Sequence, residues 1–207
     1  MNRMIAAAIA LLITWAAAVP AATIYADRTA FESQLGTSIT DDYEAAYPAV
    51  GFAIYSDASM TAFLGETGYE STHFSDLNII NSGAYCAGCN GSFRLTFTAT
   101  SVTGASGVFG VGMDLPTQAL TVASVTYGDN ATEDFALPGS HSFWGITSPL
   151  EIKSIHFGLA GGVASNQLAV QIDNLTIGNA GSAIPEPGTW AMLGAGLGVL
   201  TLVRRRR

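Results

Sequence analysis

Positive charge is the scarcest property of this sequence. Its 207 residues include 8 Lys and Arg against 16 Asp and Glu, for a formal net charge of −8. Most of the cations lie at the two ends, at Arg3 and Arg204–Arg207, so the middle of the chain holds only Arg28, Arg94 and Lys153. A domain this acidic repels phosphate backbones. The composition argues against a nucleic-acid partner and is compatible with solubility outside the cell or with cation binding.

Short motifs of catalysis and phosphate binding are also missing. There is no Gly-x-Ser-x-Gly motif, no metalloprotease helix and no phosphate-binding loop. His73, His141 and His156 have no acid or nucleophile at motif spacing. Acids distant in sequence can still form a glycosidase site, but a chain this short has little room for a deep cleft. The sequence favours a non-enzymatic protein, with a small secreted glycoside hydrolase as an alternative.

The only cysteines are Cys86 and Cys89, in a stretch of turn-forming composition. No second cysteine pair exists to complete a zinc tetrahedron. A redox Cys-x-x-Cys motif usually begins a helix in a βαβ setting, which this region lacks. In an exported protein two cysteines most often pair. We therefore predict a local disulfide, with free thiols or a metal site as the remaining alternatives.

The N-terminus has an apolar run shorter than the roughly 20 residues of a membrane span. Arg3 precedes this run, which extends from Met4 to Val19 and leads into the small residues Ala21 and Ala22. A positive start, an apolar segment and a small-residue site are typical of a secretory signal peptide. Residues 1–22 are therefore predicted to be a signal peptide, with a buried helix or a membrane anchor as the alternative.

The C-terminus combines three features in order. Pro185, Glu186 and Pro187 come first, and an apolar segment from Trp190 to Val203 follows. The chain finishes with four consecutive arginines, which are Arg204, Arg205, Arg206 and Arg207. Arginines directly after an apolar helix are what the positive-inside rule expects of a segment that stops in the membrane with its end in the cytoplasm. The segment is short and contains several glycines, which predicts a transient anchor.

This order resembles the PEP-CTERM sorting signal of Gram-negative bacteria, which the membrane protease and transpeptidase exosortase recognises. The resemblance covers residues 184–207, with 190–203 as the transmembrane helix and the four arginines as the membrane stop. It implies exosortase as a partner, a transient inner-membrane intermediate, and delivery to the outer surface or the extracellular matrix. In the family this system accompanies exopolysaccharide and biofilm production. The alternative is a proline-rich linker before an ordinary tail anchor.

Residues 23–178 have the size of one domain and are followed by a small-residue linker at 179–183. One short helix is predicted after the signal peptide, with Asp27 as its N-cap and Gly36 as its stop. Downstream, Phe93, Leu95 and Phe97 alternate with polar residues, as in a half-buried antiparallel strand. Further strands are predicted at 107–114, 120–127, 133–137, 152–158 and 168–177.

These strands predict an all-β fold, an antiparallel β-sandwich of jelly-roll kind with one short N-terminal helix. A β-helix solenoid is the rival architecture, but the sequence has no fixed repeat period. The stretches 143–147, 152–157 and 172–175 are similar to the C-terminal strands of β-sandwich domains that precede PEP-CTERM tails. Those strands in turn resemble carbohydrate-binding jelly rolls.

In such jelly rolls, a structural calcium is often held by an acidic residue from an early segment and an aspartate from the final strand. The resemblance assigns these positions to Glu44 and Asp173, and Ca²⁺ is the one cofactor that it suggests. The alternative is a solvated acidic loop and an aspartate that makes a turn hydrogen bond. A calcium-stabilised carbohydrate-binding module, with extracellular polysaccharide as its partner, is therefore an alternative function.

Four aromatic residues would suit a sugar-binding surface if their rings were exposed. Trp144, Tyr55, Tyr69 and Tyr127 offer flat apolar faces with polar edges. Core positions in a sandwich are the alternative for all four, and the sequence leaves the sugar-binding residues unassigned.

Overall fold

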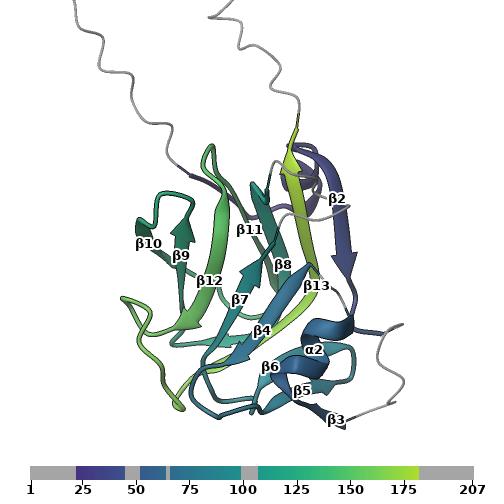
Figure 1. The fold of residues 1–207 in the computed structure, drawn as a ribbon, viewed down its shortest axis with the longest axis vertical. Helices are drawn as coiled ribbons and strands as arrows, with labels where there is room; N and C mark the ends of the chain where they lie inside the picture. Colours follow the sequence, from purple (N-terminus) through teal and green to yellow (C-terminus); the bar gives the residue numbers. More distant parts are fainter. Residues whose placement is uncertain (1–21, 45–51, 64–65, 99–106, 182–207) are drawn as a thin grey trace, which may run out of the picture.

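The computed structural model describes residues 22–44, 52–63, 66–98 and 107–181, which form two antiparallel β-sheets packed face to face (Figure 1). Its elements in chain order are β1 (Thr23–Tyr25), α1 (Arg28–Glu32), β2 (Leu35–Asp41), β3 (Phe52–Tyr55), α2 (Asp57–Phe63), β4 (Thr67–Ser71), β5 (Asn78–Asn81), β6 (Ala84–Ala87), β7 (Phe93–Phe97), β8 (Gly110–Ala119), β9 (Val122–Tyr127), β10 (Thr132–Ala136), β11 (Ser142–Thr147), β12 (Ile152–Gly158) and β13 (Ala169–Ala180). The predicted all-β sandwich is confirmed.

The larger sheet has eight strands in the order β1-β11-β8-β13-β6-β5-β3, with β2 also paired to β13. The smaller sheet has five strands in the order β10-β9-β12-β7-β4. The strands predicted downstream of residue 92 are present, and β11 covers the stretch 143–147, which the resemblance to β-sandwich domains had marked and the strand pattern had not. Strand β13 runs to Ala180, two residues beyond the predicted end of the domain.

Helix α1 begins as predicted, because the Oδ1 atom of Asp27 accepts a hydrogen bond from the Ala30 N–H at 2.7 Å. It ends at Glu32 instead of near Gly36, since the chain turns back into the sheet as β2 from Leu35. Helix α2 is a second short helix, which the sequence analysis missed.

The core lies between the inner faces of the two sheets. The predicted alternation in β7 is confirmed, because Phe93, Leu95 and Phe97 are all buried. Phe93 contacts Phe157 of β12 with ring centroids 4.9 Å apart, and it contacts Tyr85 of β6 at the same centroid distance. The contact with Phe157 lies within the smaller sheet, whereas the contact with Tyr85 joins the two sheets across the sandwich.

Strand β13 contains a bulge between Asp173 and Thr176 where its pairing with β8 shifts. Before the bulge Val170 and Ile172 face the core, and after it Leu175 and Ile177 do, each at most 2% exposed. Strict alternation would send one of these pairs to the outer face, so the extra residue keeps both on the core side. The bulge also divides the neighbours of β13, which pairs with β6 at Ile172 and with β2 from Leu175 onward.

A patch of glycines on the outer face of the larger sheet receives α1. A Cβ atom at Gly112 would lie 2.6 Å from the Phe31 ring, and one at Gly145 would lie 2.9 Å from it. Gly178 is similarly close to Leu35. Phe31 is fully buried as a result, although it lies outside the main core. Because glycine has no side chain, these positions leave the space in which Phe31 and Leu35 pack against the sheet.

The N-terminal and C-terminal residues of the described domain lie at the same end of the sandwich (Figure 1). Thr23 of β1 pairs with Thr147, Thr147 pairs with Gly110, and Gly110 pairs with Gly178 of β13. Three strand spacings of about 4.8 Å separate Thr23 from Gly178, or about 14 Å. We call the end that contains this row the terminal end.

Replacing Gly112 with Ala is expected to lower the free energy of unfolding by about 1–3 kcal/mol, because the new Cβ would overlap the buried Phe31 and Phe143 rings. Urea denaturation of the exported chain measures this. Gly139→Ala is the matched control, since none of the described residues lies within 4 Å of a Cβ at that position. Equal effects of the two substitutions would contradict the proposed role of the glycine patch.

Candidate functional site

Arg28 is the centre of an ion-pair and hydrogen-bond cluster on the outer face of the larger sheet. Its Nη2 atom lies 3.1 Å from Asp114 Oδ2 and donates to the Asn174 carbonyl at 3.1 Å. Its Nη1 atom donates to Thr176 Oγ1 at 3.1 Å, and the guanidinium carbon lies 4.8 Å from the centroid of the Phe143 ring. Arg28 therefore ties α1 to β8, β11 and β13.

The carboxylate of Asp173 lies close enough to Asp114 and to Glu44 for their charges to interact. Asp173 of β13 pairs with Asp114 of β8 in the sheet. Burial raises the pKa of Asp173 and the negative charges of Asp114 and Glu44 add to the rise, while a hydrogen bond from Asn174 N–H and the charge of Arg28 oppose it. The structure thus places Glu44 and Asp173, the two residues selected from the sequence, in one electrostatic neighbourhood. Asp114 belongs to it too, and no local sequence signal marks that residue.

The donor set around Asp173 does not fit a metal ion as it is arranged. Within the described residues, no group of three or more His, Cys, Asp or Glu side chains is placed to hold one. Calcium requires roughly six to eight oxygen ligands, and here Arg28 supplies a positive charge directly beside Asp114. Calcium binding at Glu44 and Asp173 stays a prediction.

The aromatic residues considered for sugar stacking are mostly in the core. Trp144 is 1% exposed, Tyr69 3% and Tyr127 6%, and Tyr55 is half-buried. Strand β11 directs Trp144 inward, where its ring contacts Phe157 in a T-shaped arrangement. The hypothesis that Trp144, Tyr69 or Tyr127 offers a face to a sugar is therefore wrong, because alternation along each strand places these rings between the sheets.

A row of polar residues crosses the outer face of the smaller sheet. Asp134, Ser124, His156, Arg94 and Glu70 are successive partners on β10, β9, β12, β7 and β4. The row ends in an ion pair, with Arg94 Nη1 2.7 Å from Glu70 Oε2. At its other end, Ser124 Oγ donates to Asp134 Oδ1 at 2.5 Å, and this hydrogen bond lowers the pKa of Asp134.

The row contains Ser, His and Asp but not the hydrogen-bond order of a catalytic triad. Asp134 binds Ser124, whereas Nε2 of His156 lies 2.9 Å from Thr72 Oγ1. A triad needs the histidine between the hydroxyl and the carboxylate, so this row is not arranged as one.

The turn at 159–163 covers the row, since Gly161 N–H donates to Asp134 at 2.6 Å and Gly162 N–H donates to Ser124 at 3.0 Å. The arrangement is suited to fastening this turn onto the sheet.

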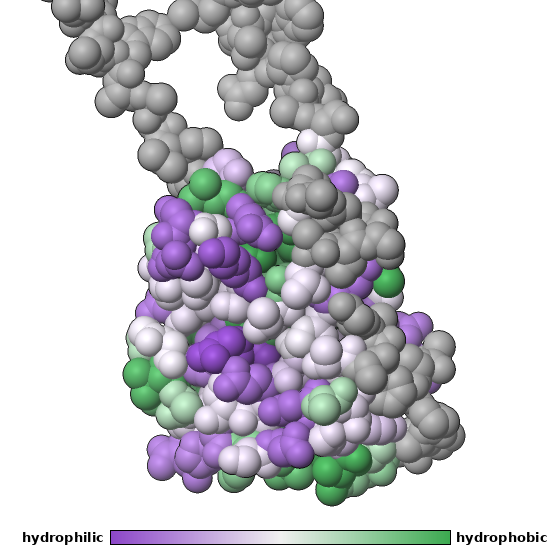
Figure 2. Space-filling view, in the orientation of Figure 1, coloured by the Kyte–Doolittle hydropathy of each residue, from purple (hydrophilic) through white to green (hydrophobic). Residues whose placement is uncertain are grey.

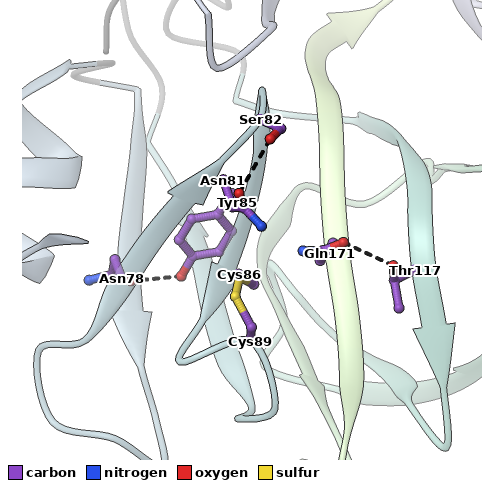
Figure 3. Close-up of a disulfide and its surroundings, with 8 residues drawn as sticks. All are labelled: Asn78, Asn81, Ser82, Tyr85, Cys86, Cys89, Thr117 and Gln171. Atoms are coloured by element: carbon purple, nitrogen blue, oxygen red, sulfur yellow. Dashed lines mark hydrogen bonds between the residues drawn. A yellow bond between two sulfur atoms is a disulfide. The ribbon is translucent and has the colours of Figure 1, made fainter. Parts of the chain in front are cut away.

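Cys86 and Cys89 lie at disulfide-bonding distance, with their sulfur atoms 1.98 Å apart, so the prediction that they pair is confirmed. Figure 3 shows the bridge at the turn that follows β6, beside the Tyr85 ring, whose hydroxyl donates to Asn78 Oδ1 at 2.7 Å. Gly88 and Cys89 both have positive φ, 56° and 58°. The bridge closes a small loop, which limits its stabilisation because loop-closure entropy grows with loop length.

Two shallow clefts lie on the larger sheet. The first, of about 310 Å³, is lined by Asp114 and Phe143 of the Arg28 cluster together with Pro116 and His141. The second, of about 190 Å³, lies at the terminal end and is lined by nine uncharged residues, which include Gln34, Pro149 and Gly181. The first is at the lower limit of typical ligand pockets, which measure roughly 300–1,000 Å³, and the second is below it. We call the second one the terminal groove.

The predicted sorting segment and nearly all of the predicted signal peptide lie outside the described residues. This applies to the motif Pro185, Glu186 and Pro187 and to the apolar segment 190–203. It applies equally to the predicted membrane stop, which consists of Arg204, Arg205, Arg206 and Arg207. Among the helices within the described ranges, none is both long enough and apolar enough to cross a membrane.

Comparison with protein families identifies residues 183–207 as a PEP-CTERM protein-sorting motif. The motif marks an exported protein that an exosortase processes after transient anchoring in the membrane. The suspected sorting signal is thereby confirmed within one residue of its predicted start, and the match includes all four terminal arginines. Comparisons with curated proteins and with solved structures give no match.

The stability of the domain is expected to fall as the pH drops from about 6.5 to 4, because of His156. Burial, and next the charge of Arg94, lower its pKa from 6.5 to about 4. The unfolded chain therefore binds this proton more readily within that window, which costs up to about 3 kcal/mol at its lower end. His156→Gln should flatten the dependence measured by urea denaturation. The exposed His141→Gln is the control, and an unchanged slope in His156→Gln would contradict the assignment.

Asp173→Asn is expected to raise the free energy of unfolding at pH 7, by on the order of 0.5 kcal/mol. A raised pKa in the folded state means that ionising Asp173 destabilises the fold. The gain should disappear below pH 3.8, the ordinary value for this group, where the carboxyl is protonated in both states. Thermal unfolding with calcium or with a chelator provides the measurement, and Asp129→Asn is a control in an exposed turn. Destabilisation by Asp173→Asn in calcium alone would instead support a calcium site.

Proposed function

We propose that the mature domain is a non-enzymatic surface or extracellular-matrix protein, released to the outside by exosortase and associated with exopolysaccharide and biofilm. The observation that carries the proposal is the sorting motif at residues 183–207. Exported proteins with this signal leave the membrane after processing. The folded sandwich is then the part that acts outside the cell.

The geometry of the sandwich supports a role in display. The last strand, β13, leads directly toward the sorting segment, and the opposite end of the larger sheet lies about 30 Å away along β8, a strand of 10 residues. A domain held at its terminal end therefore presents its opposite end to the surroundings. Residues 23–178 hold 15 Asp and Glu against Arg28, Arg94 and Lys153, and this net charge of −12 favours solubility at the cell surface.

The clefts support a structural role over catalysis. The cleft beside Asp114 is shallow, and Arg28 covers the Phe143 ring next to it. The polar row on the other sheet lies under the turn at 159–163, where its hydrogen bonds are used within the fold. Substrate-sized ligands usually need deeper sites with convergent polar groups.

A calcium-stabilised carbohydrate-binding module is the second candidate. The proximity of Glu44 to Asp173 favours it, because one residue follows β2 and the other lies in the final strand. Against it stand the buried aromatic rings and the Arg28 ion pair. A glycan site on this domain would have to use other residues.

Expression in a host with its exosortase and in one without it tests the proposal. Intact mass should show loss of the arginine tail only where the enzyme is present, and the shortened protein should appear in the surface or matrix fraction. Replacing Pro185, Glu186 and Pro187 together with Ala is the control and should retain the tail in both hosts. A tail retained by the unmodified chain in both hosts would contradict the proposal and leave an ordinary anchored protein.

A further inference from the structure

Hydrogen bonds hold the chain to the folded domain until Gly181, a few residues before the sorting motif. Gly181 N–H donates to the Gln34 carbonyl at 3.1 Å, and Asn179 Oδ1 accepts from Thr37 N–H at 2.8 Å. Only Ser182, Ala183 and Ile184 separate Gly181 from Pro185. An extended chain advances at most about 3.5 Å per residue. Pro185 is therefore within about 14 Å of Gly181 whatever path the chain takes.

The motif is equally close to the apolar segment. Gly188 and Thr189 are the only residues between Pro187 and Trp190. The polar layer on each side of a bilayer is roughly 5–8 Å thick. When the apolar segment is in the membrane, Pro185–Pro187 thus lies at or near the outer interface. An enzyme embedded in the membrane that engages the motif must then meet the end of the sandwich, because the tether between them is so short.

The surface at this end suits such a contact. Among the described residues, no charged side chain lines the terminal groove, although the whole chain carries a net charge of −8. Ile24 and Leu150, 44% and 36% exposed, add apolar surface at the same end. The adjacent Glu151 lies toward Gly107, since its Oε1 is 2.8 Å from the position of a Cβ there. Figure 2 shows apolar residues (green) beside polar ones (purple) near this end of the molecule, and further apolar residues at the opposite end.

We propose that the surface formed at the terminal end by Gln34, Pro149, Leu150 and Gly181 is a docking surface for the membrane-embedded exosortase. The inference rests on the proposed processing and adds to it that the enzyme contacts the folded domain as well as the tail. The uncharged groove and the short tether act together. The tether holds the groove against the outer face of the enzyme, and a groove lined by uncharged residues avoids the cost of burying an unpaired charge at the contact.

Site-specific photo-crosslinking of the full-length precursor tests the contact. A photoreactive residue at Gln34 should give an adduct with exosortase, identified by mass. The same residue at the exposed Gln167 should not, because Gln167 precedes β13 at the opposite end of the sheet. Inserting eight Gly and Ser residues between Ser182 and Ala183 should abolish the Gln34 adduct while the tail is still cleaved. Cross-links from Gln34 to lipid alone, or equal adducts from both positions, would overturn the proposal.

Processing rates provide the second readout. Gln34→Glu with Leu150→Glu should slow cleavage about fivefold or more, because two carboxylates would be buried without partners at the contact. The matched pair, Gln167→Glu with Leu120→Glu, places the same changes at the far end and should leave the rate unchanged. In the variant with the eight-residue insertion, the Gln34 and Leu150 substitutions should lose their effect. A slowing that persists with the long tether, or is shared by the far-end pair, would overturn the docking surface.

These outcomes separate this proposal from the proposed function. If the unmodified precursor is not cleaved in the exosortase host, both fail. If it is cleaved but Gln34 gives no adduct with the enzyme, only the docking surface fails.

Discussion

The bulge in β13 is the constraint on which the rest of the domain depends. It lets one strand of twelve residues place Val170 and Ile172, and then Leu175 and Ile177, on the same core face. It also determines what lies beside the strand, with β6 before the bulge and β2 after it. Asn174, at the bulge, has a φ of 48°, and its carbonyl accepts a hydrogen bond from Arg28. The local distortion therefore joins the core, the sheet order and the outer cluster.

Arg28 shows how a domain with few cations uses them. One guanidinium stacks on an aromatic ring, pairs with a carboxylate and donates to two oxygen atoms of β13, so it fixes the N-terminal helix over the glycine patch. The other two cations of the domain contact Glu70, in the case of Arg94, and Asn130, in the case of Lys153. A fork of five donors suits the crowded position better than an ammonium group would. Because Arg28 also pairs with Glu32 and Asp114 and donates to the Asn174 carbonyl, it offsets only part of the cost of burying Asp173.

The sequence predicted the fold better than it predicted the site. Alternation in β7, the N-cap at Asp27 and the turn around Cys86 depend on local residues, and all three were predicted correctly. The proximity of Glu44 to Asp173 followed from a resemblance, and their neighbour Asp114 depends on strand pairing, which one sequence does not specify. Trp144 was ambiguous because an aromatic ring suits a core and a surface equally. The bulge did leave a signal, since Asp173 and Asn174 are adjacent polar residues that break the alternation of Ile172 and Leu175.

Thr23 and Gly178 lie in one row of paired strands, so both ends of the domain are on the same side of the sandwich. This arrangement determines where a label can be attached. A reporter fused before Thr23 would lie on the same side as the sorting segment, between the sandwich and the membrane, where bulky antibodies have poor access. A tag after the sorting segment would be removed with it. The turn between β8 and β9, where Leu120 is 76% exposed, is at the opposite end and faces outward in an anchored precursor. An epitope inserted in that turn would report the protein in both its anchored and its processed form.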